Sequence, residues 1–297
     1  MQVSEENMNL VKKIREKDVL LVLISEEMMQ QYPAQKKEMF VRTREGETHI
    51  YLYKPLNMEV SCPLIINIHG GGFIKGIFDK DEYFSRKTVN CVGCAVIDID
   101  YKIAPESMFP VALNECYDVV KWAYDNSEEL GIDKNRIAVY GHSAGATLTA
   151  GLTIMANRSK EFSVAFQVLD YPPMDLFTDA GEKRNPPGIS EALIDKARLF
   201  NAMYIAPEES KNPLASPVFA SIDQLVGLPP ALVITAGFDG LCDEGEKYVG
   251  MLREAGVEVV ATRFINSIHG FTVGLSEGHK EAEDLIFGSA KRYLGLV

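Results

Sequence analysis

The stretch Gly-His-Ser-Ala-Gly at residues 141–145 follows a buried apolar run at 137–140 and opens a helical pattern at 144–156. A strand that turns sharply into a helix around a serine needs a glycine on each side, because the backbones come too close there for a Cβ atom. The bare motif is weak, and its place between a strand and a helix makes it specific. The stretch therefore predicts that Ser143 is a nucleophile at the end of a strand.

Strand and helix patterns alternate around this stretch from about residue 37 onward. Continuous apolar runs, typical of strands buried on both faces, occur at 64–68, 95–99, 137–140, 165–169, 231–235 and 257–264. Helical patterns lie at 80–90, 111–124, 144–156, 244–255 and 281–293. Two earlier strands, 39–42 and 49–53, flank a turn at Glu45-Gly46 and should pair antiparallel. The alternation predicts an α/β fold with a mostly parallel eight-stranded sheet flanked by helices.

Two segments fall outside the alternation, residues 1–36 and 172–228. The second is rich in proline and has one helical pattern, at 190–204. A structureless loop of that length is improbable inside a compact domain, so it is interpreted as an inserted subdomain. The 297 residues are then one main domain, 37–297, with an appendage.

The composition excludes several classes of protein. The formal net charge of −12 disfavours contact with nucleic acid or with anionic membrane surfaces. The apolar run at 19–24 is far shorter than the ~20 residues of a membrane span, so we expect no membrane anchor, no signal peptide and a cytoplasmic location. A chain of this kind can be monomeric or can form a homodimer through an exposed edge strand.

Five scattered cysteines argue against a disulfide framework. Cys91 and Cys94 are spaced as in a redox or zinc element, but a structural zinc site needs two more ligands at similar spacing, and none follows. We therefore expect the pair to be small residues that enter the strand at 95–99, and we expect no metal site.

The stretch His-Gly-Gly-Gly at residues 69–72 follows the strand at 64–68. Consecutive glycines let backbone N–H groups turn toward one point, which is what a developing oxyanion requires. Gly71 and Gly72, with the N–H of Ala144, are the predicted donors. A nucleotide-binding loop is the alternative, but Ile77 stands where a phosphate-binding loop has its lysine.

A serine nucleophile needs a base and an acid that orients the base. Of the five histidines, His269 follows the last strand in a polar turn at the end of the sheet where α/β sites form. His69 is better placed to brace the glycine loop. Asp239 follows the strand at 231–235 and is the predicted acid. Asp243 is the alternative, but we interpret it as the N-cap of the next helix. The three catalytic candidates occur in the order Ser143, Asp239, His269.

These motifs together resemble the hormone-sensitive-lipase-like family of α/β-hydrolase carboxylesterases. The resemblance runs from about residue 60 to the C-terminus and rests on five motifs in order: His69–Phe73, Asp100–Glu106, Gly141–Gly145, Asp239 with Asp243-Glu244, and His269–Phe271. It implies the α/β-hydrolase fold and a helical cap formed by 1–36 and 172–228. The sequence departs from the family at His142, where aspartate is usual, at Ala146 in place of glycine, and at Phe73 in place of tryptophan. We expect the His142 ring to pack behind the turn.

The resulting hypothesis is a serine esterase without a cofactor, acting on short carboxylic esters through Ser143, His269 and Asp239. The predicted pocket contributors are Phe73, Tyr171, Leu199, Met203 and Ile268. Two rivals are a peptidase or amidase with the same three residues, which usually carries a large additional domain, and a non-catalytic receptor, whose usual sign would be a missing catalytic residue.

Overall fold

The computed structural model describes residues 5–18, 24–57 and 61–297, without the side chains of 5, 6, 17 and 18. Most of the apolar run at 19–24 and parts of the predicted cap segment 1–36 lie outside these residues. Within the described residues, no helix is long and apolar enough to span a membrane.

Eight strands form a single sheet, as predicted. They are β1 (Gln35–Thr43), β2 (Gly46–Lys54), β3 (Cys62–Ile68), β4 (Ala95–Asp100), β5 (Ile132–His142), β6 (Phe166–Asp170), β7 (Ala231–Phe238) and β8 (Val259–Ile268). Their order is β1-β2-β4-β3-β5-β6-β7-β8. β2 pairs antiparallel with β1 and β4, and all other pairs are parallel.

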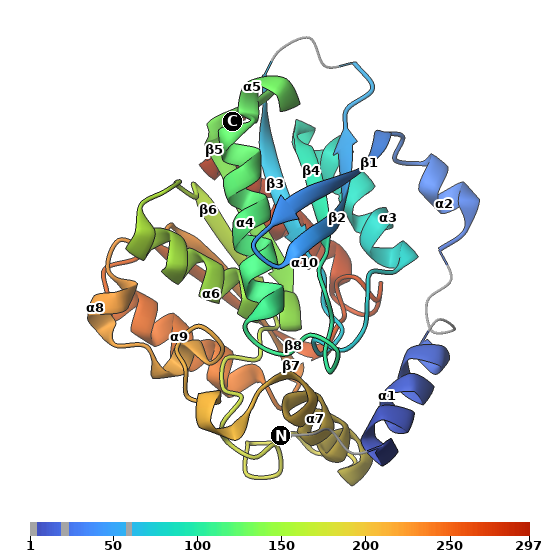
Figure 1. Ribbon diagram of the computed structural model, residues 1–297, viewed down its shortest axis with the longest axis vertical. Helices are drawn as coiled ribbons and strands as arrows, with labels where there is room; N and C mark the ends of the chain where they lie inside the picture. The colour runs from blue at the N-terminus through green and yellow to red at the C-terminus, as the bar shows by residue number, and fades with distance from the viewer. Residues whose placement is uncertain (1–4, 19–23, 58–60) are drawn as a thin grey trace.

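The α-helices of the described chain are α1 (Glu5–Asp18), α2 (Glu26–Gln30), α3 (Asp79–Thr88), α4 (Val111–Asp125), α5 (Ser127–Leu130), α6 (Ala144–Ser159), α7 (Glu191–Tyr204), α8 (Ile222–Leu225), α9 (Cys242–Glu254) and α10 (His279–Tyr293). A π-helical turn, η1 (Val89–Gly93), follows α3, and short 3₁₀ turns lie at η2 (Pro207–Glu209) and η3 (Pro217–Phe219). α3 and α10 cover one face of the sheet, and α4, α6 and α9 cover the other (Figure 1).

The apolar runs become central strands because both of their faces are covered. All seven residues of β3 are buried. The prediction of burial on both faces was wrong for β8, in which Ile265 is 72% exposed. As the last strand in the order, β8 has only one neighbouring strand, so it alternates like an edge strand.

Two local predictions also need correction. Asp243 is not the N-cap of α9, because Leu241 occupies that position and Asp243 lies in the first turn. Cys91 does not enter the strand: it lies in η1, and only Cys94 is fully buried beside β4. All five cysteines are free thiols. Gly256 ends α9 with a positive φ of 78°, as expected.

The strand register brings the candidate residues together. Ile68 of β3 lies opposite Gly141 of β5, His142 lies opposite Asp170 of β6, and Asp170 lies opposite Ile234 of β7. The parallel strands therefore end side by side, and the loops that follow them open at one edge of the sheet. Figure 1 places α1 and α7 at the end of the molecule where these loops lie.

Candidate active site

The turn at residues 141–145 is strained around its serine. Ser143 has φ 53° and ψ −124°, a backbone region that side-chain-bearing residues rarely adopt. A Cβ on Gly145 would lie 1.9 Å from the carbonyl oxygen of Ile68, and one on Gly141 would lie 2.2 Å from that of Gly145. Both glycines are therefore required, and the turn holds the Ser143 side chain at the start of α6.

Ser143, His269 and Asp239 form a continuous hydrogen-bonded chain. His269 Nδ1 lies 2.7 Å from Asp239 Oδ2, and its Nε2 lies 2.8 Å from Ser143 Oγ. A carboxylate only accepts, so Nδ1 carries the proton and donates it, which leaves Nε2 to accept the hydroxyl hydrogen of Ser143. The imidazole is thereby held in the tautomer that a general base requires.

Secondary contacts fix the two partners of the serine. Asp239 Oδ1 accepts the N–H of Leu241 at 3.0 Å, and the Asp239 side chain is only 7% exposed. The Tyr171 ring meets the His269 ring edge-on, with 5.0 Å between the centroids. Burial of His269 lowers the pKa of its imidazole, and the charge and hydrogen bond of Asp239 more than offset this, so the pKa is raised overall.

The glycine loop lies beside the serine with unusual backbone angles. Gly71 and Gly72 have φ values of 112° and 60°. In the described part of the chain, neither glycine N–H donates a hydrogen bond to any turn or loop acceptor, and the same holds for the N–H of Ala144 at the start of α6. The predicted donors are thus uncommitted toward such acceptors, and Gly71 and Gly72 line the same cavity as Ser143.

The ring of His142 was predicted to pack behind the turn; it is buried and contacts the glycine loop directly, but it also lines the cavity that Ser143 lines. Its Nε2 accepts the N–H of Gly70 at 2.9 Å, and Asp81 Oδ1 lies 3.2 Å from the same nitrogen. Burial lowers the pKa of His142, which favours the neutral ring that can accept this bond. His69, expected to brace the loop, touches Gly70 through its own Nδ1 and stacks on Tyr101.

The serine opens into a cavity of about 420 Å³ beneath α7. Phe73 and Tyr171 line it, as predicted, but Leu199, Met203 and Ile268 do not. Helix α7 presents another face to the cavity, made of Leu193, Lys196, Ala197, Phe200 and Asn201. Leu199 and Met203 pack instead against the core, and Ile268 is 56% exposed on the edge strand.

Several residues at this site escaped the sequence prediction. The backbone carbonyl of Asp170 accepts the N–H of Ser143 at 2.8 Å, and its buried carboxyl group is hydrogen-bonded by Tyr140 and Thr272. Burial raises the pKa of Asp170 to about 7. Lys75, Lys80, Lys183 and Lys196 also line the cavity. The spacing of residues 193, 196, 197, 200 and 201 shows one helical face, but a sequence does not say what that face covers.

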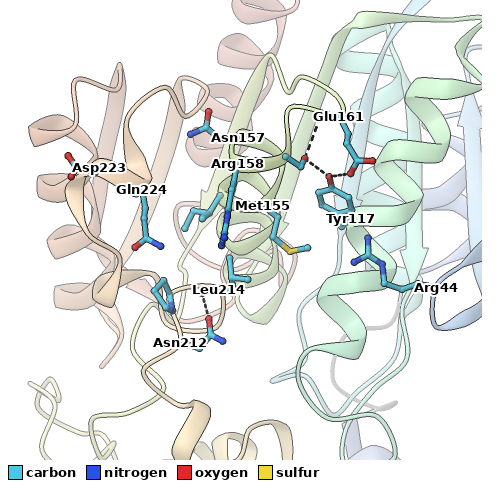
Figure 2. Close-up of a pocket in the computed structure, with 13 residues that line it drawn as sticks. Arg44, Tyr117, Met155, Asn157, Arg158, Glu161, Asn212, Leu214, Asp223 and Gln224 are labelled. Carbon is cyan, nitrogen blue, oxygen red and sulfur yellow. Dashed lines mark hydrogen bonds between the residues drawn. The ribbon is translucent and has the colours of Figure 1, made fainter.

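A larger hollow, of about 860 Å³, lies elsewhere, between α4, α6 and the chain around residues 212–224 (Figure 2). Several of its polar groups are bonded to neighbouring side chains. The hydroxyl of Tyr117 lies 2.6 Å from both Ser159 Oγ and Glu161 Oε2, and Arg44 pairs with Asp118. None of the predicted site residues lines it, so volume does not identify the functional site.

The sheet, the strained serine turn and the serine–histidine–aspartate chain define an α/β-hydrolase fold, in which Ser143 is the candidate nucleophile. A family model described as alpha/beta hydrolase fold matches residues 65–273. Over 237 residues the chain is 34% identical to an arylesterase of Saccharolobus solfataricus, covering 79% of this chain and 76% of that protein. It is 31% identical over 248 residues to an ethyl acetate hydrolase of Pseudomonas putida, covering 79% and 74%.

A solved structure agrees over nearly the whole chain. An esterase of Pyrobaculum calidifontis superposes with a TM-score of 0.83 at 34% identity, covering 98% of this chain and 99% of that one. The chain belongs to the hormone-sensitive-lipase-like family of α/β-hydrolases.

Proposed function

We propose that the chain is a serine carboxylesterase that hydrolyses short-chain carboxylic esters. The observation that carries the proposal is the pair of hydrogen bonds that joins Ser143 Oγ to His269 Nε2 and His269 Nδ1 to Asp239. The names of the similar proteins, an arylesterase and an ethyl acetate hydrolase, support esters as the substrate class.

The reaction would proceed in two halves through an acyl-enzyme. Ser143 Oγ attacks the ester carbonyl carbon while His269 Nε2 takes the hydroxyl proton, and the leaving alcohol then receives that proton as the C–O bond breaks. Water attacks the acyl-enzyme with His269 again acting as base, which releases the acid and restores Ser143. Asp239 stabilises the imidazolium formed in each half.

The negative charge that develops on the carbonyl oxygen needs hydrogen-bond donors. We assign this role to the backbone N–H groups of Gly71, Gly72 and Ala144, whose hydrogen bonds are uncommitted among the described residues. Losing one such donor typically costs about 10²-fold to 10³-fold in rate. His142 holds the loop through its bond to Gly70, and no step of this proposal uses it.

The cavity supports a preference for small esters. Its volume of about 420 Å³ lies near the lower end of the ~300–1,000 Å³ that is usual for small-molecule sites. We propose that 1–36 and 172–228 form the cap. In support, α7 lines the cavity, and Arg15 of α1 donates to the carbonyls of Ile74 and Ala104 near it. Residues 217–225 pack on α6 and α9 and would anchor this cap.

Two finer proposals concern the protein as a whole. Its five free thiols suit a reducing compartment, so a cytoplasmic location stays our prediction. A homodimer through the exposed edge strand β8 also stays a prediction. The exposed apolar side chains of Ile265 and Ile268 would lie in its interface. Solution mass measurement gives the number of chains, and cell fractionation gives the location.

The test of the esterase is hydrolysis of p-nitrophenyl esters with acyl chains of two to twelve carbons. We expect turnover of the short esters, a fall in kcat/KM as the chain lengthens, and loss of activity in Ser143→Ala. Parent-level activity in Ser143→Ala would contradict the role of the serine. Absence of activity at every chain length would contradict the esterase itself and favour a receptor.

A further inference from the structure

Asp170, the last residue of β6, is bonded to the segments that carry the candidate nucleophile and the candidate base. Its backbone carbonyl accepts the N–H of Ser143 at 2.8 Å. Its carboxylate oxygen Oδ2 accepts the hydroxyl of Thr272, which follows His269 closely in the same loop. One residue therefore connects the serine turn with the histidine loop.

Tyr171, the next residue, extends this connection to the histidine ring. Its backbone φ of 39° lies in the left-handed region, which residues with a side chain rarely adopt. Its ring meets the His269 ring edge-on, and its hydroxyl oxygen lies 2.7 Å from Thr272 Oγ1. The hydroxyl hydrogen of Thr272 points to Asp170, because a carboxylate only accepts, so the Tyr171 hydroxyl donates to Thr272.

The hydroxyl groups around Asp170 form a chain of donors that ends on its carboxylate. Tyr171 donates to Thr272, Thr272 donates to Asp170 Oδ2, and Tyr140 donates to the same oxygen at 3.0 Å. Each bond in such a chain polarises the next and favours negative charge at its end. Asp170 is fully buried, and its other oxygen, Oδ1, has no hydrogen-bond partner among the described residues. The geometry therefore stabilises an ionised carboxylate at this buried position.

In the described part of the chain, no lysine or arginine forms an ion pair with Asp170. Each of three other buried carboxyl groups has a lysine partner: Glu115 with Lys102, Glu244 with Lys183, and Glu283 with Lys87. Burial lowers the pKa of His269, the charge and hydrogen bond of Asp239 raise it, and the charge of Asp170 raises it further. An imidazolium on His269 thus has a second anion close to it.

We propose that Asp170 is a positioning residue for ester hydrolysis: its carbonyl and carboxylate hold the serine turn and the histidine loop together, and its negative charge stabilises the imidazolium that His269 becomes in each half of the reaction. The proposal rests on the esterase function above and adds a second carboxylate to its mechanism. Asp239 keeps the hydrogen bond to the ring, whereas Asp170 acts on the ring through its neighbours and its charge.

The pH profile of Asp170→Asn separates charge from shape. The asparagine carbonyl can accept from Thr272 and Tyr140 where Oδ2 does, so the variant removes the charge and keeps the acceptor. With p-nitrophenyl acetate, we expect the plateau value of kcat at alkaline pH to fall about tenfold, the scale of one lost charge interaction in a buried site. We also expect the midpoint of the acid limb to move to lower pH, because the imidazolium loses an anion.

Other titratable groups lie around Asp170 and His269. They are Tyr140 and His142 on β5, Tyr171 after β6, Lys80 and Asp81 of α3, and Asp239. Because none of them is replaced, a change in the pH profile reports the charge of Asp170.

Asp98→Asn is the matched control. Asp98 is another fully buried aspartate in a strand: its Oδ1 accepts from Asn67 and Ser85, and its Oδ2 has no partner among the described residues. Burial raises its pKa to about 8. Its hydrogen bonds go to β3 and α3 rather than to the serine turn or the histidine loop, so we expect kcat and the midpoint to stay unchanged.

The bond to the histidine loop has a test of its own. Thr272→Val removes the hydroxyl group and keeps the branched shape, whereas Thr272→Ser keeps the hydroxyl. We expect kcat to fall about threefold to tenfold in Thr272→Val, the scale of one hydrogen bond, and to stay within about twofold in Thr272→Ser. Urea unfolding establishes that both variants are folded, and this pair keeps the proposal testable if Asp170→Asn does not fold.

Three outcomes would overturn the role of Asp170. The first is an unchanged midpoint in Asp170→Asn, even with a lower kcat, because a merely structural residue would give that result. The second is the same shift in Asp98→Asn, and the third is equal kcat in Thr272→Val and the parent protein. Each leaves the esterase standing, since the parent hydrolyses p-nitrophenyl acetate in all three. A parent protein without that activity would instead contradict the proposed function.

Discussion

The two hollows of this molecule differ in a way that volume does not reveal. The groove between α4, α6 and residues 212–224 is about 860 Å³, and the cavity beneath α7 is about 420 Å³. In the groove, Tyr117 is already bonded to Ser159 and Glu161 (Figure 2). The cavity is lined instead by the strained Ser143 and by Gly71 and Gly72, whose N–H groups donate to no turn or loop acceptor among the described residues. We place the proposed reaction in the smaller hollow, because that hollow is lined by the hydrogen-bonded Ser143, His269 and Asp239.

Replacing the proposed base should give the largest loss of activity, and a matched substitution in the groove should give none. His269→Ala removes the group that takes the serine proton, so we expect kcat to fall on the order of 10⁴-fold or more in p-nitrophenyl acetate hydrolysis. His142→Ala should cost far less, because the hydrogen bond of His142 goes to Gly70 and not to Ser143. Tyr117→Phe, in the groove, is the control with unchanged kcat/KM. A larger loss in His142→Ala than in His269→Ala would reverse our choice of base.

The acid gives the next largest effect. Asp239→Asn leaves the shape of the side chain but replaces the acceptor of the Nδ1 proton, so we expect kcat to fall about 10³-fold to 10⁴-fold through the wrong imidazole tautomer. Asp243→Asn is the matched control, since among the described residues Asp243 pairs with Arg184, at 3.4 Å, and it lies in the first turn of α9. Comparable losses in both variants would undermine the assignment of Asp239.

The serine turn should be intolerant of one added methyl group. Gly145→Ala places a Cβ 1.9 Å from the carbonyl oxygen of Ile68, and overpacking of this kind costs about 3 kcal/mol in the free energy of unfolding. Gly288→Ala, in the middle of α10, meets nothing within 4 Å and should stabilise the protein by about 0.5–1 kcal/mol. Urea unfolding measures both, and equal midpoints would contradict the close approach at the turn.

The pH dependence of the reaction should report the pKa of His269. The base must be neutral, and the pKa of His269 is raised above its ordinary 6.5. Activity therefore increases with pH through a midpoint above 6.5, and kcat/KM falls as the pH drops below it. Glu161→Gln, in the groove, should leave this midpoint in place. A midpoint below 6.5 would mean that Asp239 does not offset the burial of the ring.

The smallest effect is expected from the groove itself. Arg158 lines it on the last turn of α6, at the opposite end of that helix from Ser143. Arg158→Gln should leave kcat/KM for p-nitrophenyl acetate within about twofold and the free energy of unfolding within about 0.5 kcal/mol, as for other surface substitutions. A tenfold loss of activity would show that the larger hollow takes part in the reaction.

The order of apolar runs and loops predicted the sheet and brought Ser143, Asp239 and His269 to one edge. That succeeded because parallel strands end side by side, so residues that follow strands must meet. The residue types at the strand ends then narrowed the set of catalytic candidates, since only a few kinds of side chain can serve as nucleophile, base or acid. The exposure of β8 was missed because the composition of a strand does not state whether a neighbour covers it.

The pocket wall was the part that sequence described least well. Helix α7 was predicted at residues 190–204, but its rotation about its own axis depends on tertiary packing, so Leu199 and Met203 were chosen where Lys196 and Phe200 face the cavity. Ile268 was chosen for its place beside His269, yet neighbouring residues in a strand point to opposite faces. The sequence predicted that these helices and strands exist, but it did not predict which of their side chains face the cavity.

Covalent labelling tests the central claim most directly. A fluorophosphonate ester reacts with a serine only when a neighbouring base activates it, so incubation followed by peptide mass spectrometry identifies the nucleophile. The account predicts one modified residue, Ser143, together with complete loss of esterase activity, and no labelling in His269→Ala. Labelling of another serine, or full inactivation without modification of Ser143, would contradict the account.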